Sequence, residues 1–165
     1  MKRLFLLAIC ALTLISANAQ LKWVDATTLN ICGHTIRNAE SPYSRIDAKA
    51  YGFTNKAIIR YSDYSTGLYV MFKTNSSKIS ARWENEPKRI GDNMSGISQL
   101  GLDLYIKDNG KWRFAAVGRV STLPENNVRT KTLIKNLAEG EKECLLYLPG
   151  WCELTKLEIG IDEDA

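Results

Sequence analysis

The chain has 165 residues, of which 45% are hydrophobic, with a formal net charge of +4 and a single histidine. This length suits one domain with a packed core and is short for two. So weak a charge is no argument for a nucleic-acid partner, and one histidine without a C-x-x-C motif predicts neither a metal site nor a cofactor.

The first 19 residues predict a cleaved signal peptide. Lys2 and Arg3 precede an apolar stretch from Leu4 to Ile15, and Ala17-Asn18-Ala19 has the A-x-A pattern of a cleavage site. The apolar stretch is short for a membrane span, so an N-terminal anchor is the less favoured interpretation. We therefore expect export to the periplasm or the cell exterior, and a mature domain of residues 20–165 without a membrane span.

Three cysteines remain in the mature chain: Cys32, Cys144 and Cys152. In an oxidising compartment they could form one disulfide and leave one free thiol. They could equally be three thiols packed as small apolar side chains. The sequence leaves both alternatives open.

Short strands separated by turn residues predict an all-β fold, an antiparallel β-sandwich of jelly-roll type. Several segments alternate as half-buried strands do: Ile79, Ala81 and Trp83 share one face, while the polar residues between them share the other. Trp83 is accordingly expected in the core. The predicted strands are Leu21 to Val24, Lys56 to Ser62, Leu68 to Thr74, Lys78 to Trp83, Leu102 to Lys107, Trp112 to Arg119, Glu143 to Leu148 and Lys156 to Asp162.

Three segments are harder to interpret. Residues 84–99 contain Pro87 and two glycines and predict a long loop. Residues 126–139 could form a helix, although Thr130, Thr132 and Asn136 make it a poor one. Ile31 to His34 suggest a strand end followed by a turn. We expect His34 to be a hydrogen-bonded structural or surface residue, because no partner residue for catalysis is recognisable.

The clearest local prediction is a β-hairpin over residues 101–114. Asn109-Gly110 is the favoured two-residue type I′ turn, in which both residues need a positive φ. On the first strand Leu102, Leu104 and Ile106 share one face, and Asp103, Tyr105 and Lys107 share the other.

The string Gly101-Leu102-Asp103-Leu104-Tyr105 resembles the GxDLY signature of a domain that precedes SGNH (GDSL-like) hydrolase-type esterases, mostly in secreted proteins of Bacteroidetes. Other segments resemble the same family, over about residues 43 to 162. They are Ser65 to Asn75 ("SAGLxxRFKT"), Ile79 to Trp83 ("IxxRW"), and Leu146 to Trp151 with Leu157 to Ile161 ("YLPLY…LEIG"). Departures from the pattern are Met71 in place of arginine, Gln99-Leu100 before the signature, and Gly150 and Cys152 after Pro149.

The resemblance implies an esterase, but this chain lacks the hydrolytic residues. Ile90-Gly91-Asp92-Asn93 is the nearest match to a Gly-Asp-Ser block, and Asn93 occupies the serine position. An amide cannot act as the nucleophile, and no late Asp-x-x-His pair follows to supply a base. A self-sufficient esterase is therefore the least supported interpretation.

The favoured interpretation is a non-catalytic N-terminal accessory domain of a secreted SGNH-type esterase acting on esterified glycans. Its partner would be a hydrolase domain that this chain lacks. The alternative is a free-standing carbohydrate-binding β-sandwich, with Trp151 after the Pro149-Gly150 turn as an exposed ring for a sugar. We predict no catalytic residue, and a candidate interdomain face formed by Gly101, Asp103, Leu104, Tyr105 and Trp151.

Overall fold

The structure, a computed structural model, describes residues 21–37, 39–87, 90–120 and 127–165. Its strands are β1 (Leu21–Asp25), β2 (Asn30–Cys32), β3 (Tyr69–Thr74), β4 (Ile79–Asn85), β5 (Leu102–Asp108), β6 (Lys111–Gly118), β7 (Val128–Ile134), β8 (Lys142–Tyr147) and β9 (Leu154–Asp162). Its helices are α2 (Lys56–Ser62), α3 (Gly96–Leu100) and the 3-10 turn η2 (Ala26–Thr28).

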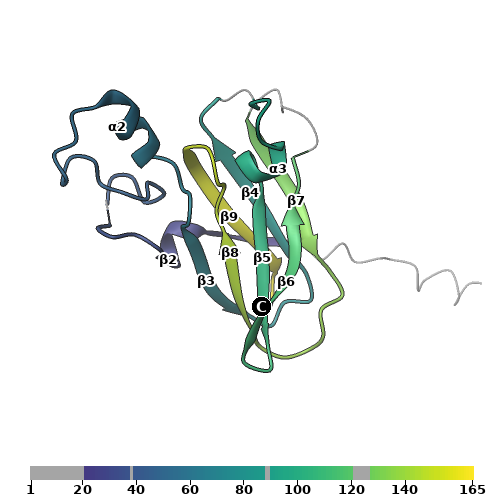
Figure 1. The fold of residues 1–165 in the computed structure, drawn as a ribbon. Coiled ribbons are helices and arrows are strands. Elements are labelled where there is room, and N and C mark those ends of the chain that lie inside the picture. Colours follow the sequence, from purple (N-terminus) through teal and green to yellow (C-terminus); the bar gives the residue numbers. More distant parts are fainter. Residues whose placement is uncertain (1–20, 38, 88–89, 121–126) are drawn as a thin grey trace, which may run out of the picture.

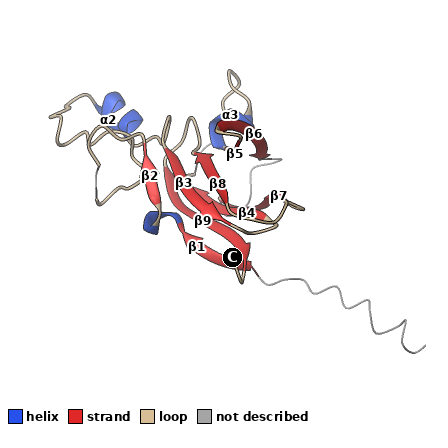
Figure 2. Ribbon diagram, turned by 90° about the horizontal axis from the view of Figure 1, so that it is seen from below, coloured by secondary structure: helices blue, strands red, loops and turns tan. Residues whose placement is uncertain are grey.

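These strands form two antiparallel sheets that pack against each other as the layers of a sandwich (Figures 1 and 2). The four-stranded sheet has the order β1-β9-β4-β7, and the five-stranded sheet has the order β2-β3-β8-β5-β6. Helix α2 lies beside the β2–β3 edge, and α3 lies at one end of the sandwich (Figure 1). The predicted all-β antiparallel sandwich is confirmed.

The core lies between the sheets and follows the predicted alternation. Ile79, Ala81 and Trp83 are fully buried on β4, and the five-stranded sheet contributes Leu104 and Leu146. The indole Nε1 of Trp83 donates a hydrogen bond to the Leu100 carbonyl at 2.9 Å. Without this bond, burial of the ring would leave the indole N–H with no hydrogen-bond partner.

The hairpin of residues 101–114 is confirmed. Asn109 and Gly110 have φ values of 48° and 77°, so both take the left-handed conformation that the turn requires. Leu104 pairs with Ala116 and Tyr105 with Phe114, which leaves one extra residue on β6 as a bulge.

The prediction of a strand at Lys56–Ser62 is wrong, because this segment is helix α2. The side chain of Asn55 accepts hydrogen bonds from the backbone N–H groups of Ala57 and Ile58, and this cap starts the helix. Ile58 is 47% exposed, so the apolar residues of the segment do not mark a buried strand face.

Residues 126–139 contain a strand, β7, which the sequence did not reveal. Thr130 and Thr132 are poor helix formers because they are branched at Cβ, and the same property favours a strand. The predicted loop of residues 84–99 begins inside β4 and ends in α3, for which the Ser95 side chain is the N-cap. At β2, Gly33 with a φ of 98° follows the strand, consistent with the expected strand end and turn.

Cys32, Cys144 and Cys152 are all free thiols, and the latter two are buried. Nε2 of His34 lies 2.9 Å from the Pro42 carbonyl oxygen, which is the structural role expected of this residue. Within the described ranges no helix is long and apolar enough to cross a membrane. The predicted signal peptide falls outside those ranges.

Candidate functional site

Segments that resemble the family meet at the end of the sandwich where α3 lies (Figure 1). The Ser65 hydroxyl donates to the Pro149 carbonyl at 3.2 Å, and the Thr66 hydroxyl donates to the Gly150 carbonyl at 2.6 Å. The turn before β3 therefore holds the turn after β8 in place.

Gly101, the first residue of the signature, lies where no side chain fits. Its N–H donates to the Ile97 carbonyl at 2.8 Å, and a Cβ built here would lie well inside 3.0 Å of the same oxygen. The carbonyl oxygen of Gly118 would lie 3.0 Å away on another side. Because its φ of −84° suits any residue, Gly101 is required for space and not for conformation. Leu104 is fully buried, so Gly101 and Leu104 are both packing residues.

Asp103 and Tyr105 point away from the core. Among the described residues, none makes a hydrogen bond or an ion pair to the exposed Asp103 carboxylate. The Tyr105 ring meets the Phe114 ring edge-on, with 5.7 Å between centroids, and the Tyr147 ring at 5.8 Å. Tyr147 in turn lies 5.4 Å from Tyr69. These four aromatic side chains cross β3, β8, β5 and β6, and we call this outer surface of the five-stranded sheet the aromatic face.

Two lysines on the same outer surface form ion pairs, whereas Asp103 forms none with the described residues. Lys73 binds Glu141 and Lys107 binds Glu143, each with 2.9 Å between nitrogen and oxygen. The hydrogen bond from Lys107 holds the pKa of Glu143 below its usual value. The Lys107 ammonium also lies 5.7 Å from the centre of the Trp112 ring. On the side of these pairs away from the hairpin turn, Met71, Leu145, Tyr105 and Phe114 lie in register across four strands.

Trp151 belongs to a different cluster. Its ring centroid lies 5.3 Å from those of both Tyr61 and Tyr64, and its backbone N–H donates a hydrogen bond to the Gln99 carbonyl at 3.1 Å. It therefore joins the segment around α2 to the end of the sandwich. The structure brings Asp103 and Tyr105 together on the aromatic face but does not bring Trp151 into that face.

Gln99 is a structural residue that sequence reasoning missed. Its side chain is buried, donates to the carbonyls of Met94 at 2.8 Å and Gly91 at 3.3 Å, and accepts from the Gly91 N–H at 3.2 Å. These bonds hold the Gly91-Asp92-Asn93 segment, the imitation of a serine block, against α3. A lone glutamine after a loop carries no sequence pattern that would have predicted this role.

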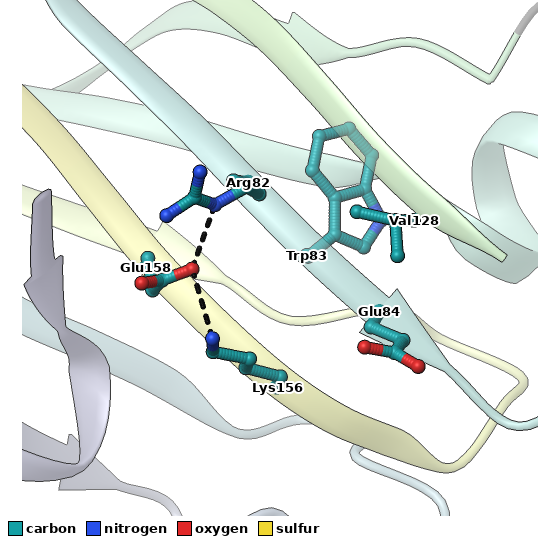
Figure 3. A pocket seen from close by; sticks show the side chains of 6 residues that line it. All are labelled: Arg82, Trp83, Glu84, Val128, Lys156 and Glu158. Carbon is teal, nitrogen blue, oxygen red and sulfur yellow. Dashed lines mark hydrogen bonds and ion pairs between the residues drawn. The ribbon is translucent and has the colours of Figure 1, made fainter. Parts of the chain in front are cut away.

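A small pocket of about 120 Å³ lies on the opposite sheet (Figure 3). Oε2 of Glu158 accepts from Arg82 Nε at 2.7 Å and lies 3.4 Å from Lys156 Nζ. Both contacts lower the pKa of Glu158, with the Arg82 hydrogen bond contributing most. The Arg82 guanidinium also lies over the Trp23 ring, 4.5 Å from its centre. The pocket is thus lined by groups that largely neutralise one another, as expected for charges on a strand surface.

The chain was compared with protein families, with curated proteins and with solved structures. The family GxDLY, the N-terminus of SGNH hydrolase-type esterases, matches residues 21–165. The crystal structure of a protein from Bacteroides ovatus that is described as a GDSL-like lipase superposes with a TM-score of 0.80 and 37% identity, over 88% of this chain and 42% of that one. The salicylyl-acyltransferase SsfX3 of a tetracycline biosynthetic pathway shares the fold, with a TM-score of 0.56 and 18% identity over 88% of this chain and 40% of its own.

No match was found among curated proteins. The chain spans less than half the length of both structural relatives. The family model matches residues 21–165, a range that contains every described residue. This chain therefore belongs to the GxDLY family, the N-terminal domain of SGNH hydrolase-type esterases.

Proposed function

We propose that this chain is a non-catalytic accessory domain of a secreted SGNH-type esterase that acts on esterified glycans. The observation that carries the proposal is the length of the relative from Bacteroides ovatus. This chain covers 42% of that GDSL-like lipase, so more than half of the relative lies outside the shared domain. A hydrolase domain of this kind would supply the nucleophile, the base and the oxyanion donors.

Residues with catalytic chemistry serve local structure in this chain. The His34 ring bonds the Pro42 carbonyl, and the Ser95 hydroxyl accepts from the Ser98 N–H at the start of α3. Asn93 stands where a serine would be needed, and its amide is not a nucleophile. Because these side chains are used in local hydrogen bonds, an accessory role is better supported than catalysis by this chain itself.

An activity assay tests the proposal. Residues 20–165 are purified and incubated with p-nitrophenyl acetate and with acetylated xylo-oligosaccharides, beside a catalytically dead SGNH esterase as the control. We expect no turnover above the control. Turnover that disappears when one serine of this chain is replaced would overturn the proposal.

A complementary arm tests the accessory role directly. The GDSL-like protein from Bacteroides ovatus is prepared with and without its matched N-terminal domain, and thermal unfolding and ester hydrolysis are measured for both forms. We expect the shortened enzyme to lose stability or activity, because a surface that packs on the missing domain becomes exposed to water. Equal behaviour of the two forms would contradict an accessory role.

A carbohydrate-binding module remains the second candidate, because Trp112 on β6 is 38% exposed. Against it, neighbouring rings of the aromatic face are inclined at 59° to 80° to each other. Rings at such angles form no single flat platform for a sugar, whereas they suit the irregular packing of a protein contact. The test is a titration of the domain with oligosaccharides, followed by tryptophan fluorescence. A saturable change in fluorescence would favour the carbohydrate-binding module.

A further inference from the structure

We infer that the aromatic face is the surface on which the hydrolase domain docks, and that Asp103 receives an arginine or lysine of that domain. The inference rests on the proposed function, because it takes the hydrolase domain as the occupant. It adds which surface of this domain the hydrolase domain contacts, which kind of side chain that domain places against Asp103, and which signature residues pack inside or face outward.

The aromatic face has the composition of a contact surface. Phe114 is 59% exposed and Tyr147 is 38% exposed, although both are large apolar side chains. The pairing register places Met71, Leu145, Tyr105 and Phe114 side by side across β3, β8, β5 and β6. Three spacings between strands make this stripe roughly 14 Å wide. Contiguous apolar surface of this kind on a domain commonly marks an interaction site.

Asp103 lies at the edge of this stripe. In the neighbouring row it is paired with Tyr147 on one side and Val117 on the other. A docking domain would take its carboxylate out of water, and an unpaired buried carboxylate is strongly unfavourable. An arginine or lysine of the hydrolase domain that pairs with Asp103 would offset this cost. A partner surface without such a cation would bind less well.

The outer surface of the four-stranded sheet is less suited to this role. There Glu158 binds both Arg82 and Lys156 (Figure 3). The Arg82 guanidinium also covers the Trp23 ring. Docking on that surface would require desolvating charges that already satisfy one another, for little apolar contact in return. On the aromatic face, by contrast, the charge pairs of Lys73 and Lys107 lie towards the hairpin end of the strands.

The signature then divides into two functions. Gly101 and Leu104 pack inside the domain, while Asp103 and Tyr105 face the partner. Strand alternation accounts for Leu104 pointing opposite to Asp103 and Tyr105, since successive side chains point to opposite surfaces. Gly101 precedes β5 and is confined instead by the backbone of Ile97 and Gly118. A five-residue string can therefore specify both the fold at α3 and the docking surface beside it.

Hydrogen exchange on a chimaera tests the inference. Residues 20–165 replace the matched domain of the GDSL-like protein from Bacteroides ovatus, and hydrogen exchange is compared between this chimaera and residues 20–165 alone. We expect at least tenfold slower exchange in residues 102–107 and 142–147 of the chimaera. Residues 80–85 and 156–160 of the opposite sheet should be unchanged. Alkylation of Cys32, which pairs with Tyr69, should also be slower in the chimaera.

Two matched variants identify the role of Asp103. Asp103→Asn should reduce the protection of residues 102–107 and 142–147 at least tenfold. Glu84→Gln, which removes a carboxylate from the opposite sheet, should leave that protection unchanged. If Asp103→Asn behaves as the unaltered chimaera, the assignment of Asp103 is wrong.

The two proposals can fail separately. Protection of residues 80–85 and 156–160 in place of the aromatic face would overturn the docking surface and leave the accessory role standing. If no segment is protected, the docking surface is also refuted. The accessory role falls in addition only if the esterase without its N-terminal domain is as stable and as active as the whole enzyme.

Discussion

Replacing the signature glycine, Gly101→Ala, should destabilise the domain through a steric clash and not through strain in the backbone conformation. The added Cβ would lie well inside 3.0 Å of the Ile97 carbonyl oxygen and 3.0 Å from that of Gly118. Both are backbone atoms, one in α3 and one at the end of β6, so neither can turn aside as a flexible side chain would. The Gly101 N–H also donates to Ile97, and this hydrogen bond must lengthen as α3 moves.

Overpacking of a tight site costs about 1–3 kcal/mol, and backbone neighbours place this one at about 3 kcal/mol. For a domain of this size, 1 kcal/mol lowers Tm by about 2–4 °C, so we expect a fall of roughly 6–12 °C. Urea unfolding monitored by tryptophan fluorescence gives the change in the free energy of unfolding, and calorimetry gives Tm.

Gly91→Ala is the matched control. The atoms nearest to its Cβ would belong to the side chains of Asn93, at 3.0 Å, and Gln99, at 3.7 Å, and the Asn93 side chain can move. We expect this variant to lose less than about 1 kcal/mol. If Gly101→Ala is as stable as Gly91→Ala, the packing argument for the signature glycine is wrong, and α3 yields without penalty.

Three further predictions concern other parts of the domain. Gly110→Val should cost about 1–2 kcal/mol in urea unfolding, because Gly110 has a φ of 77° that a β-branched residue adopts only with strain; an unchanged midpoint would contradict this. Hydrogen bonds from Ser77 lower the pKa of Asp162, so its contribution to stability is present above the usual aspartate pKa and is lost as pH falls through the lowered value. Asp162→Asn should therefore flatten the stability profile below about pH 4, and a parallel profile would refute the assignment. Burial raises the pKa of Cys144 to about 12, so iodoacetamide at pH 8 should modify Cys32 and spare Cys144 in peptide mapping, and equal labelling of both would refute this.

Sequence alone determined the features that depend on local chemistry. The alternation of Ile79, Ala81 and Trp83 revealed a sandwich strand, because a strand with one buried face must alternate. Asn109-Gly110 revealed the hairpin, because few residue pairs tolerate two positive φ values. The signature string indicated the family, and the missing serine block argued against catalysis by this chain.

Tertiary structure decided the rest. Residues 56–62 form α2, which begins at the Asn55 cap, although their apolar residues had suggested a strand. Residues 128–134 form a strand because they pair with β4, although their local sequence preference is weak. Sequence grouped Trp151 with Tyr105, yet the chain carries Trp151 to Tyr61 and Tyr64 instead. The aromatic face assembles side chains from β3, β5, β6 and β8, which are separated by up to 78 positions along the chain, from Tyr69 to Tyr147. Only the order and register of the strands bring these rings together, because strand pairing depends on the packing of the whole sandwich and not on any one segment.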